Sequence, residues 1–240
     1  MWITEYLKLI QNFFLDLFFP KFCFSCQKEG GYLCQDCQGL LEILDSYFCL
    51  CKEAIRLPLA GKCKRCSHKK LNGLYFAASY QNPLIKKLIH NFKYESFLRG
   101  LRENLASLII IHFRLSEKHK TEFSDFLLIP VPLDRKRLKW RGFNQSEEIG
   151  KELAKSLEIP LITDVLLKMK ATLPQVELSD LEREENIKGS FLVKNKEKVE
   201  GRKVLLIDDV FTTGSTLNEA ARLLKEAGAS QVWGVVVARG

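Results

Sequence analysis

The chain has 240 residues, 46% hydrophobic and 28% charged, enough to bury the core of one medium domain with a small appended module. The formal net charge of +8 favours anionic partners such as phosphorylated metabolites or nucleic acid. Lys and Arg are spread along the chain, which excludes a basic tail.

Residues 1–20 are largely apolar and predict a helix. Glu5, Lys8 and Asp16 interrupt the apolar run, so it falls short of the roughly 20 apolar residues that span a bilayer. The segment also lacks the basic start and small-residue cleavage site of a secretory signal. We therefore expect a core or interface helix, no stable membrane span and a cytoplasmic location, with peripheral membrane contact as the alternative.

All eight cysteines lie between Cys23 and Cys66, mostly in tight pairs. In a reducing cytosol this pattern indicates metal ligation rather than disulfides. Two Cys-x-x-Cys pairs separated by seven residues suit one tetrahedral Zn²⁺. The four predicted ligands of this first zinc ribbon are Cys23, Cys26, Cys34 and Cys37.

A second zinc ribbon is predicted from Cys49, Cys51, Cys63 and Cys66. A single residue separates Cys49 from Cys51, so this spacing is less specific, and interleaved pairing of the two sets and a ligand role for His68 stay open. A closed four-thiolate site leaves zinc no open position, so we expect a structural metal. The Lys and Arg residues around Cys63 and Cys66 suit docking to nucleic acid or an acidic protein, or a solvated surface.

Apolar periodicity beyond residue 71 predicts alternating strands and helices. In chain order we expect a strand at 74–80, helices over 84–92 and 101–113, a strand at 126–130, a helix from Asn144 with Glu147 completing a capping box, a polar segment at 170–188, a strand at 204–207, a helix through 217–227 ended by Gly228, and a strand at 232–238.

This alternation, with continuously apolar strands, predicts an α/β fold with a parallel sheet. We expect three parts: the N-terminal apolar helix (1–20), a double zinc-ribbon module (21–70) and the α/β domain (71–240).

The sharpest motif follows the strand at 204–207, which delivers Asp208 and Asp209 into a small-residue loop that opens a helix. Ligands of parallel sheets bind beyond the carboxyl ends of strands, and helix N-termini favour phosphate. The predicted phosphate-binding residues are Thr212, Thr213, Gly214, Ser215 and Thr216. The two carboxylates suit ribose hydroxyls, contacted directly or through hydrated Mg²⁺.

This motif has two alternative interpretations. A nucleoside triphosphatase is disfavoured because the chain has no Gly-x-x-x-x-Gly-Lys-Ser/Thr loop. The second alternative is an ordinary strand-turn-helix with solvated acids.

Five positive charges occur within residues 135–141, directly after the strand that ends at Pro130 to Pro132. Cations at that edge would stabilise a departing anionic group, and Arg135 and Arg141 are the predicted catalytic cations beside Asp208 and Asp209. The alternative is a solvated basic surface or nonspecific nucleic-acid affinity.

The segment from Asp208 to Thr216 resembles the phosphoribosyl-pyrophosphate (PRPP) loop of type I phosphoribosyltransferases, and nearly the whole chain resembles the ComF competence-protein family. The wider resemblance is carried by Phe92-Lys93-Tyr94, Ile129-Pro-Val-Pro132, Arg141-Gly-Phe-Asn-Gln145, Thr172, Gln175, Arg183 and Asn186. The Cys49-x-Cys51 spacing departs from the family pattern.

The resemblance implies a phosphoribosyltransferase-like fold that binds PRPP with Mg²⁺, and a polar loop over 170–188 that closes on the site. Thr212 stands where purine-using relatives carry a carboxylate, so we expect an acceptor that needs little base help. One hypothesis is transfer of the phosphoribosyl group to an unknown acceptor in a protein linked to DNA uptake. The other is a non-catalytic adaptor or sensor that binds single-stranded DNA or DNA-uptake proteins.

Overall fold

The computed structural model describes residues 18, 20–95, 98–118, 120–169 and 186–240. The chain divides into two compact units, one up to Glu42 and one from Ile43 to Gly240. The helix predicted over 1–20 lies almost wholly outside the described residues, as do Thr172, Gln175 and Arg183 of the predicted closing loop.

The first unit is built around short turns and one helical turn. Phe22 and Glu29 form an antiparallel bridge, and the rings of Phe24 and Tyr32 stack with centroids 6.0 Å apart. The helix α2 (Gln35–Gly39) starts at Cys34, whose sulfur accepts the backbone N–H of Cys37. Among the described residues of this unit, the buried apolar side chains are Cys23, Leu33, Cys37 and Leu41, a small set of the kind expected where a metal holds the chain.

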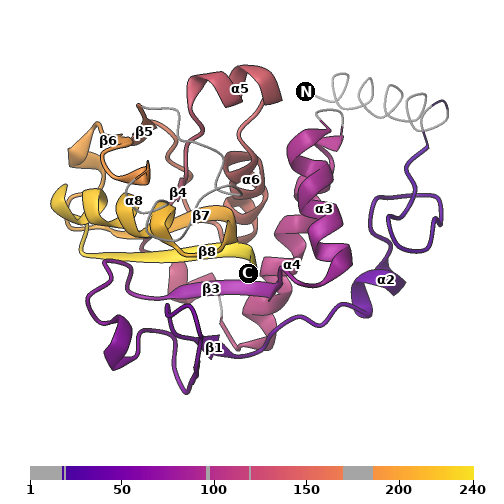
Figure 1. Cartoon of the computed structure of the whole chain (residues 1–240), viewed down its shortest axis with the longest axis horizontal. Helices are drawn as coiled ribbons and strands as arrows, with labels where there is room; N and C mark the ends of the chain where they lie inside the picture. Colours follow the sequence, from indigo (N-terminus) through magenta and orange to yellow (C-terminus); the bar gives the residue numbers. More distant parts are fainter. Residues whose placement is uncertain (1–17, 19, 96–97, 119, 170–185) are drawn as a thin grey trace. The chain divides into compact units, whose positions relative to one another are not determined.

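The second unit contains a parallel sheet of four strands in the described part of the chain (Figure 1). Its order is β3 (Leu74–Ser79), β8 (Gln231–Arg239), β7 (Lys203–Phe211) and β4 (Phe126–Pro130). All three neighbouring pairs run parallel, so the strands end at one edge. This confirms the predicted α/β fold with a parallel sheet.

Helices cover both faces of the sheet. Alternate residues of β7, Val204 and Leu206, share a buried cluster with Leu217 and Leu224 of α8 (Ser215–Glu226). On the other face Ile207 lies against Gly150 of α6 (Gln145–Leu157). The period-2 alternation of a strand explains this division, and it makes β7 apolar on both sides.

The other long helices are α3 (Pro83–Tyr94) and α4 (Leu101–Leu115). Arg102 of α4 joins α6 through ion pairs of 3.2 Å to Glu148 and 2.9 Å to Glu152. The Asn144 side chain caps α6 by accepting the N–H of Ser146, which confirms the predicted helix start. Glu147, predicted to complete a capping box, instead forms an ion pair with Lys151. These contacts hold the first turn of α6 at the edge where the strands end.

The basic run at 135–141 forms a short helix, α5 (Arg135–Arg141). The Asp134 carboxylate caps it by accepting the N–H of Arg137, and Gly142 ends it at φ 79°. The other elements in the described residues are the antiparallel pair β5 (Leu166–Lys168) and β6 (Phe191–Val193), the antiparallel pair β1 (Tyr47–Phe48) and β2 (Arg56–Leu57), and the single turns η1 (Lys64–Cys66), η3 (Lys120–Phe123) and η5 (Lys196–Lys198).

The second cysteine segment folds as part of the second unit. Cys49, Leu50 and Cys66 are buried and belong to the same apolar cluster as β7 and α8. The two compact units divide near residue 42, whereas one module is expected over 21–70. Within the second unit, the second cysteine set packs in the core with the sheet. Among the helices described, none has the length and apolar content to cross a membrane.

Candidate functional site

The first four predicted zinc ligands come together within the first unit. The sulfur atoms of Cys23, Cys26, Cys34 and Cys37 all lie within 4.8 Å of one another. The Cys26 and Cys34 sulfurs are 3.6 Å apart, close to the edge of about 3.8 Å expected for a tetrahedron with 2.3 Å zinc–sulfur bonds. The backbone N–H of Cys34 donates to the Cys23 sulfur, which stabilises a thiolate there. The group fits zinc.

The second set assembles in the same way within the second unit. The sulfurs of Cys49, Cys51, Cys63 and Cys66 lie within 4.8 Å of one another, with Cys51 and Cys63 3.5 Å apart. The first four cysteines therefore form one group and the last four another, so the two sets are not interleaved. Among the described residues His68 belongs to neither group.

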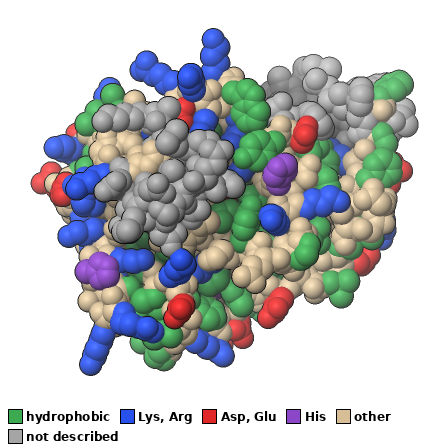
Figure 2. Space-filling model, in the orientation of Figure 1, with side chains coloured by type: hydrophobic (Ala, Val, Ile, Leu, Met, Phe, Trp, Pro, Cys, Tyr) green, Lys and Arg blue, Asp and Glu red, His purple; other side chains and the backbone are tan. Residues whose placement is uncertain are grey.

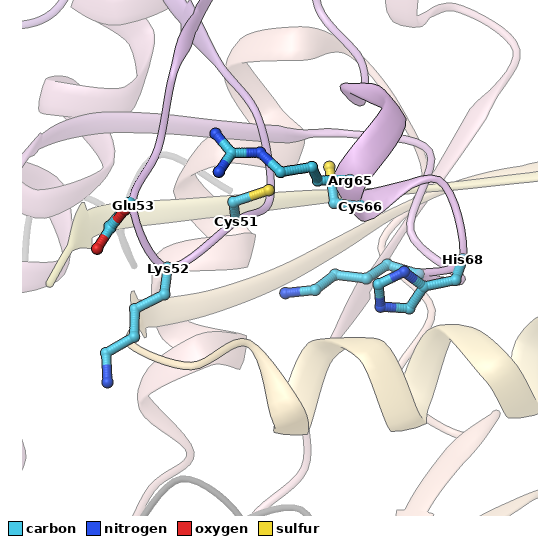
Figure 3. A pocket seen from close by; sticks show the side chains of 7 residues that line it. Cys51, Lys52, Glu53, Arg65, Cys66 and His68 are labelled. Atoms are coloured by element: carbon cyan, nitrogen blue, oxygen red, sulfur yellow. The ribbon is translucent and has the colours of Figure 1, made fainter.

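A shallow hollow of about 340 Å³ adjoins the second cysteine group (Figure 3). Cys51 and Cys66 line it together with Lys52, Glu53, Arg65, His68 and Lys69. Lys52 comes from the turn of the first cysteine pair, whereas Arg65 and His68 come from the segment of the second pair. Three of these seven lining residues are Lys or Arg and one is Glu, and this excess of positive charge favours an anionic partner.

The predicted carboxylates lie near the end of the buried strand β7. The Asp208 carboxylate accepts hydrogen bonds of 2.9 Å from the Ser146 hydroxyl and from the backbone N–H of Asp209. The Asp209 carboxylate forms an ion pair of 2.9 Å with the ammonium of Lys93, the penultimate residue of α3. The acidic pair is therefore held by the ends of two helices far apart in sequence.

Burial and mutual repulsion disfavour the charged forms of the two carboxyl groups. Burial, with the negative Asp209 beside it, raises the pKa of Asp208 to about 6. Burial opposes the charged ammonium of Lys93, yet the pKa of Lys93 is raised because Asp209 and Asp208 attract its charge. A divalent cation bound here would relieve the repulsion between the two acids.

The predicted phosphate loop follows directly. Gly214 precedes the first residue of α8 at φ 81°, in the left-handed region, and provides no side chain to cap the helix. A Cβ there would lie 2.4 Å from the Phe211 ring, so only glycine fits. The Thr213 and Ser215 hydroxyls are 2.7 Å apart at the helix start. The predicted phosphate donors are thus grouped at one helix N-terminus.

The two predicted cations, Arg135 and Arg141, differ in their exposure to solvent. Arg141 is 7% exposed, donates to the Gln145 side chain, and lies over the Tyr94 ring at 5.7 Å. Burial lowers the pKa of Arg141, while the charges of Asp209 and Asp208 oppose that shift. Arg135, in contrast, is exposed at the start of α5. Figure 2 shows Lys and Arg side chains gathered over α5 at the top of the view.

Two further side chains reach this edge without a signal in the sequence. Ser146 binds Asp208, and Lys168 at the end of β5 has its pKa lowered by burial and by nearby Arg137, against the pull of Asp208. Lys93, which belongs to the residues that carry the family resemblance, pairs with Asp209. No local spacing marks Ser146 or Lys168, because their partners lie far away along the chain.

Comparisons with known proteins agree with this geometry. Residues 144–240, which include the acidic pair and the phosphate loop, match the model of the phosphoribosyl transferase domain family. Competence protein F of Haemophilus influenzae is 31% identical over 224 residues, covering 85% of this chain and 96% of that protein. The chain belongs to the ComF competence-protein family.

Two other relatives also match most of this chain. Competence protein ComFC of Streptococcus pneumoniae is 31% identical over 212 residues, 86% of this chain and 87% of that protein. The DNA utilization protein YhgH of Escherichia coli is 34% identical over 177 residues, 71% of this chain and 75% of that protein. The family resemblance expected from the sequence is confirmed, with a phosphoribosyltransferase-type domain and cysteine groups that could bind zinc.

Proposed function

We propose that the chain binds PRPP with Mg²⁺ at residues 208–216 and transfers its phosphoribosyl group to an acceptor. The observation that supports this most is the order of groups at the end of β7. Two carboxylates lead into a glycine turn that starts α8 with Thr and Ser hydroxyls. The helix start would bind the phosphate of such a ligand, and the two carboxylates would accept hydrogen bonds from its sugar hydroxyls.

The residues have separate tasks in this proposal. Thr213, Gly214 and Ser215 would hold the 5′-phosphate, and Asp208 and Asp209 would orient the ribose. Magnesium, when bound, would neutralise the acids and the pyrophosphate. Lys93 and Ser146 keep the two carboxylates apart and fixed, so little reorganisation is needed during the reaction.

The transfer breaks the bond between ribose C1 and a pyrophosphate oxygen, which leaves with the electron pair. A new bond forms between C1 and a nucleophilic atom of the acceptor, whose proton passes to solvent. The positive charge of the buried Arg141 lies close to both acids and would stabilise the departing pyrophosphate. Exposed Arg135 would contribute less to this step.

Isothermal titration of the zinc-loaded protein with PRPP and Mg²⁺ tests the site. We expect saturable binding that weakens about tenfold or more in Asp209→Asn and in Thr213→Val, since each removes hydrogen bonds to a charged ligand. The matched control is Asp125→Asn, because Asp125 pairs with Lys203 at the opposite edge of the sheet. Absence of binding to the intact protein would refute the proposal. Unchanged affinity in both site variants would mean that PRPP binds outside residues 208–216.

Release of pyrophosphate in the presence of candidate acceptors then separates an enzyme from a sensor. Turnover that needs Mg²⁺ and is lost in Asp209→Asn supports the transferase. Tight PRPP binding without pyrophosphate release for any acceptor supports a sensor that uses the same site.

A second candidate function, binding of single-stranded DNA by a non-catalytic adaptor, is favoured by exposed aromatic groups beside cations. Trp140 is 66% exposed and Tyr94 49% exposed, with ring centroids 5.9 Å apart. Lys136 and Lys139 are exposed on the same short helix as Trp140. Stacking of bases on aromatic rings with cations along the backbone is the usual chemistry of such binding.

Fluorescence anisotropy with an oligonucleotide of mixed sequence tests this function. We expect affinity that falls with salt and drops several-fold in Trp140→Ala, since stacking contributes about 1–3 kcal/mol per base. The control variant is Leu192→Ala, another exposed apolar residue, on β6. Equal affinity in Trp140→Ala and Leu192→Ala would refute a role for this surface.

A further inference from the structure

The last residue of β8, Arg239, is a buried arginine that the proposed reaction does not use. Its side chain is 7% exposed and lies at the sheet edge where the phosphate loop begins. A buried guanidinium needs partners for its N–H groups. Its partners belong to the second cysteine group.

Arg239 holds the turn between the first two of those cysteines. One terminal nitrogen donates to the carbonyl of Cys49 at 2.6 Å, and the other donates to the carbonyl of Cys51. The Leu50 carbonyl between them accepts from the ammonium of Lys69 at 2.6 Å. Three consecutive carbonyls therefore each bind a cationic side chain, which couples the turn's shape to the end of β8.

The same guanidinium packs on the residue that supports the phosphate loop. It lies 5.2 Å from the centre of the Phe211 ring and 5.6 Å from that of Phe76. Phe211 in turn touches Gly214, where a Cβ would meet its ring at 2.4 Å. The backbone N–H of Gly240 also donates to the Phe211 carbonyl. Contacts thus run without a break from the cysteine turn to the glycine of the loop.

A second route joins the same two places. The backbone N–H of Lys70, four residues after Cys66, donates to the side chain of Asn218 at 2.7 Å. Asn218 lies in the first turn of α8, and its own N–H donates to the Gly214 carbonyl. Both cysteine pairs of the second group are therefore tied to the start of α8.

We propose that the second cysteine group positions the phosphate loop, and that Arg239 is the positioning residue between them. The inference rests on the proposed function for its ligand, and it assigns the second zinc a role in the site without direct contact. Zinc fixes the cysteine turn and hence the two carbonyls that Arg239 needs. Without them its buried donors lose partners, so Arg239 and Phe211 must shift and the Gly214 turn loosens. Zinc loading and PRPP binding would then strengthen each other by the same factor.

Hydrogen exchange measured by mass spectrometry tests the coupling without any ligand. In zinc-loaded Arg239→Lys we expect exchange at residues 211–218 to rise at least about fivefold, while α6 keeps its protection. A lysine retains the charge but cannot bind two carbonyls while stacked between two rings. The matched control is Arg202→Lys, an exposed arginine next to the start of β7. Unchanged exchange at 211–218 in Arg239→Lys would overturn the inference.

Zinc release supplies the reciprocal measurement. Replacement of Cys26 and Cys34 by serine removes the first zinc site. A coloured chelator then measures the rate at which zinc leaves the second cysteine group. We expect PRPP with Mg²⁺ to slow this release several-fold in that protein, and to have no effect once Arg239→Lys is added. Should Arg239→Lys fail to fold, Phe211→Leu interrupts the same chain of contacts and is expected to behave alike.

The outcomes separate this inference from the proposed function. If the protein does not bind PRPP but Arg239→Lys still loosens residues 211–218, the ligand assignment fails and the coupling holds. If PRPP binds with equal affinity to Arg239→Lys, Phe211→Leu and the unaltered protein, and zinc release ignores PRPP, the coupling fails and the proposed function holds.

Discussion

Ionisation of Asp208 lowers the free energy of unfolding. Burial and the neighbouring charge of Asp209 raise its pKa to about 6 from 3.8. Because the folded pKa exceeds the unfolded one, the native state holds the proton more tightly. The stability that Asp208 contributes is thus present below about pH 4 and is lost as pH rises through 6.

Asp208→Asn is therefore expected to be more stable than the unaltered protein at pH 7.5, by about 1–3 kcal/mol at 1.4 kcal/mol per pKa unit. The amide oxygen keeps both hydrogen bonds from Ser146 and Asp209 but carries no charge. Denaturant unfolding at pH 7.5 and pH 4.0 measures the effect, and the advantage should vanish at pH 4.0. A difference that does not depend on pH would contradict this origin of the strain.

Lys93 has the opposite role, because its ammonium compensates the buried acid Asp209 across 2.9 Å. Lys93→Met leaves that carboxylate without its partner, and we expect a loss of about 3 kcal/mol of unfolding free energy. The control Lys86→Met changes an exposed lysine of the same helix and should cost little. Adding Asp209→Leu to Lys93→Met should recover stability. Equal losses in the single and double variants would mean that the pair is not the cause.

At the scale of elements, both the backbone conformation and the surrounding space require glycine at position 214, and a comparison with Gly142 separates these two requirements. The φ of 81° at Gly214 disfavours any other residue, and Phe211 leaves no space for a Cβ. Gly142 has nearly the same φ, 79°, but open space around it. We expect Gly142→Ala to cost about 1 kcal/mol and Gly214→Ala about 1–3 kcal/mol more, since overpacking adds to strain. Thermal unfolding of both variants measures this, and equal losses would show that the contact with Phe211 yields freely.

Most elements followed from local patterns because their causes are local. The periodicity of residues 84–92 and 101–113 predicted α3 and α4, and both are confirmed. Gly228 ends α8 at φ 97°, with the N–H of Ala229 bonded to the carbonyl of Leu224, as its place in the sequence predicts. Strand β7 extends past the predicted 204–207 through both acids to Phe211, because pairing with β8 continues there.

The partners within the site could not be predicted in the same way. Ser146 and Asp208 are 62 residues apart, and their contact depends on how α6 crosses the sheet. The charge run at 135–141 gave no ground for separating Arg135 from Arg141. That difference arises because Arg141, at the end of α5, packs over the ring of Tyr94 from α3, whereas Arg135 is exposed at the start of α5. Long-range packing thus decides which cations of the run are buried beside the acidic pair.

At the scale of the whole molecule, the cysteine groups divide between two structural settings. Spacing predicted both groups, but it carried no information on which of them shares the core of the α/β domain. Leu50, between Cys49 and Cys51, is 1% exposed and packs in that core. The single residue between Cys49 and Cys51 thus ties this cysteine pair to the apolar core.

Disruption of the two cysteine groups should consequently affect unfolding very differently. Cys49→Ser with Cys66→Ser removes two buried ligands from the main core, and we expect the main thermal transition to fall by at least about 10 °C. Cys26→Ser with Cys34→Ser changes the group in the other compact unit and should leave that transition within about 2 °C. Differential scanning calorimetry with zinc content measured in parallel tests both. If the two double variants lower the transition equally, the second cysteine group is not integral to the α/β core.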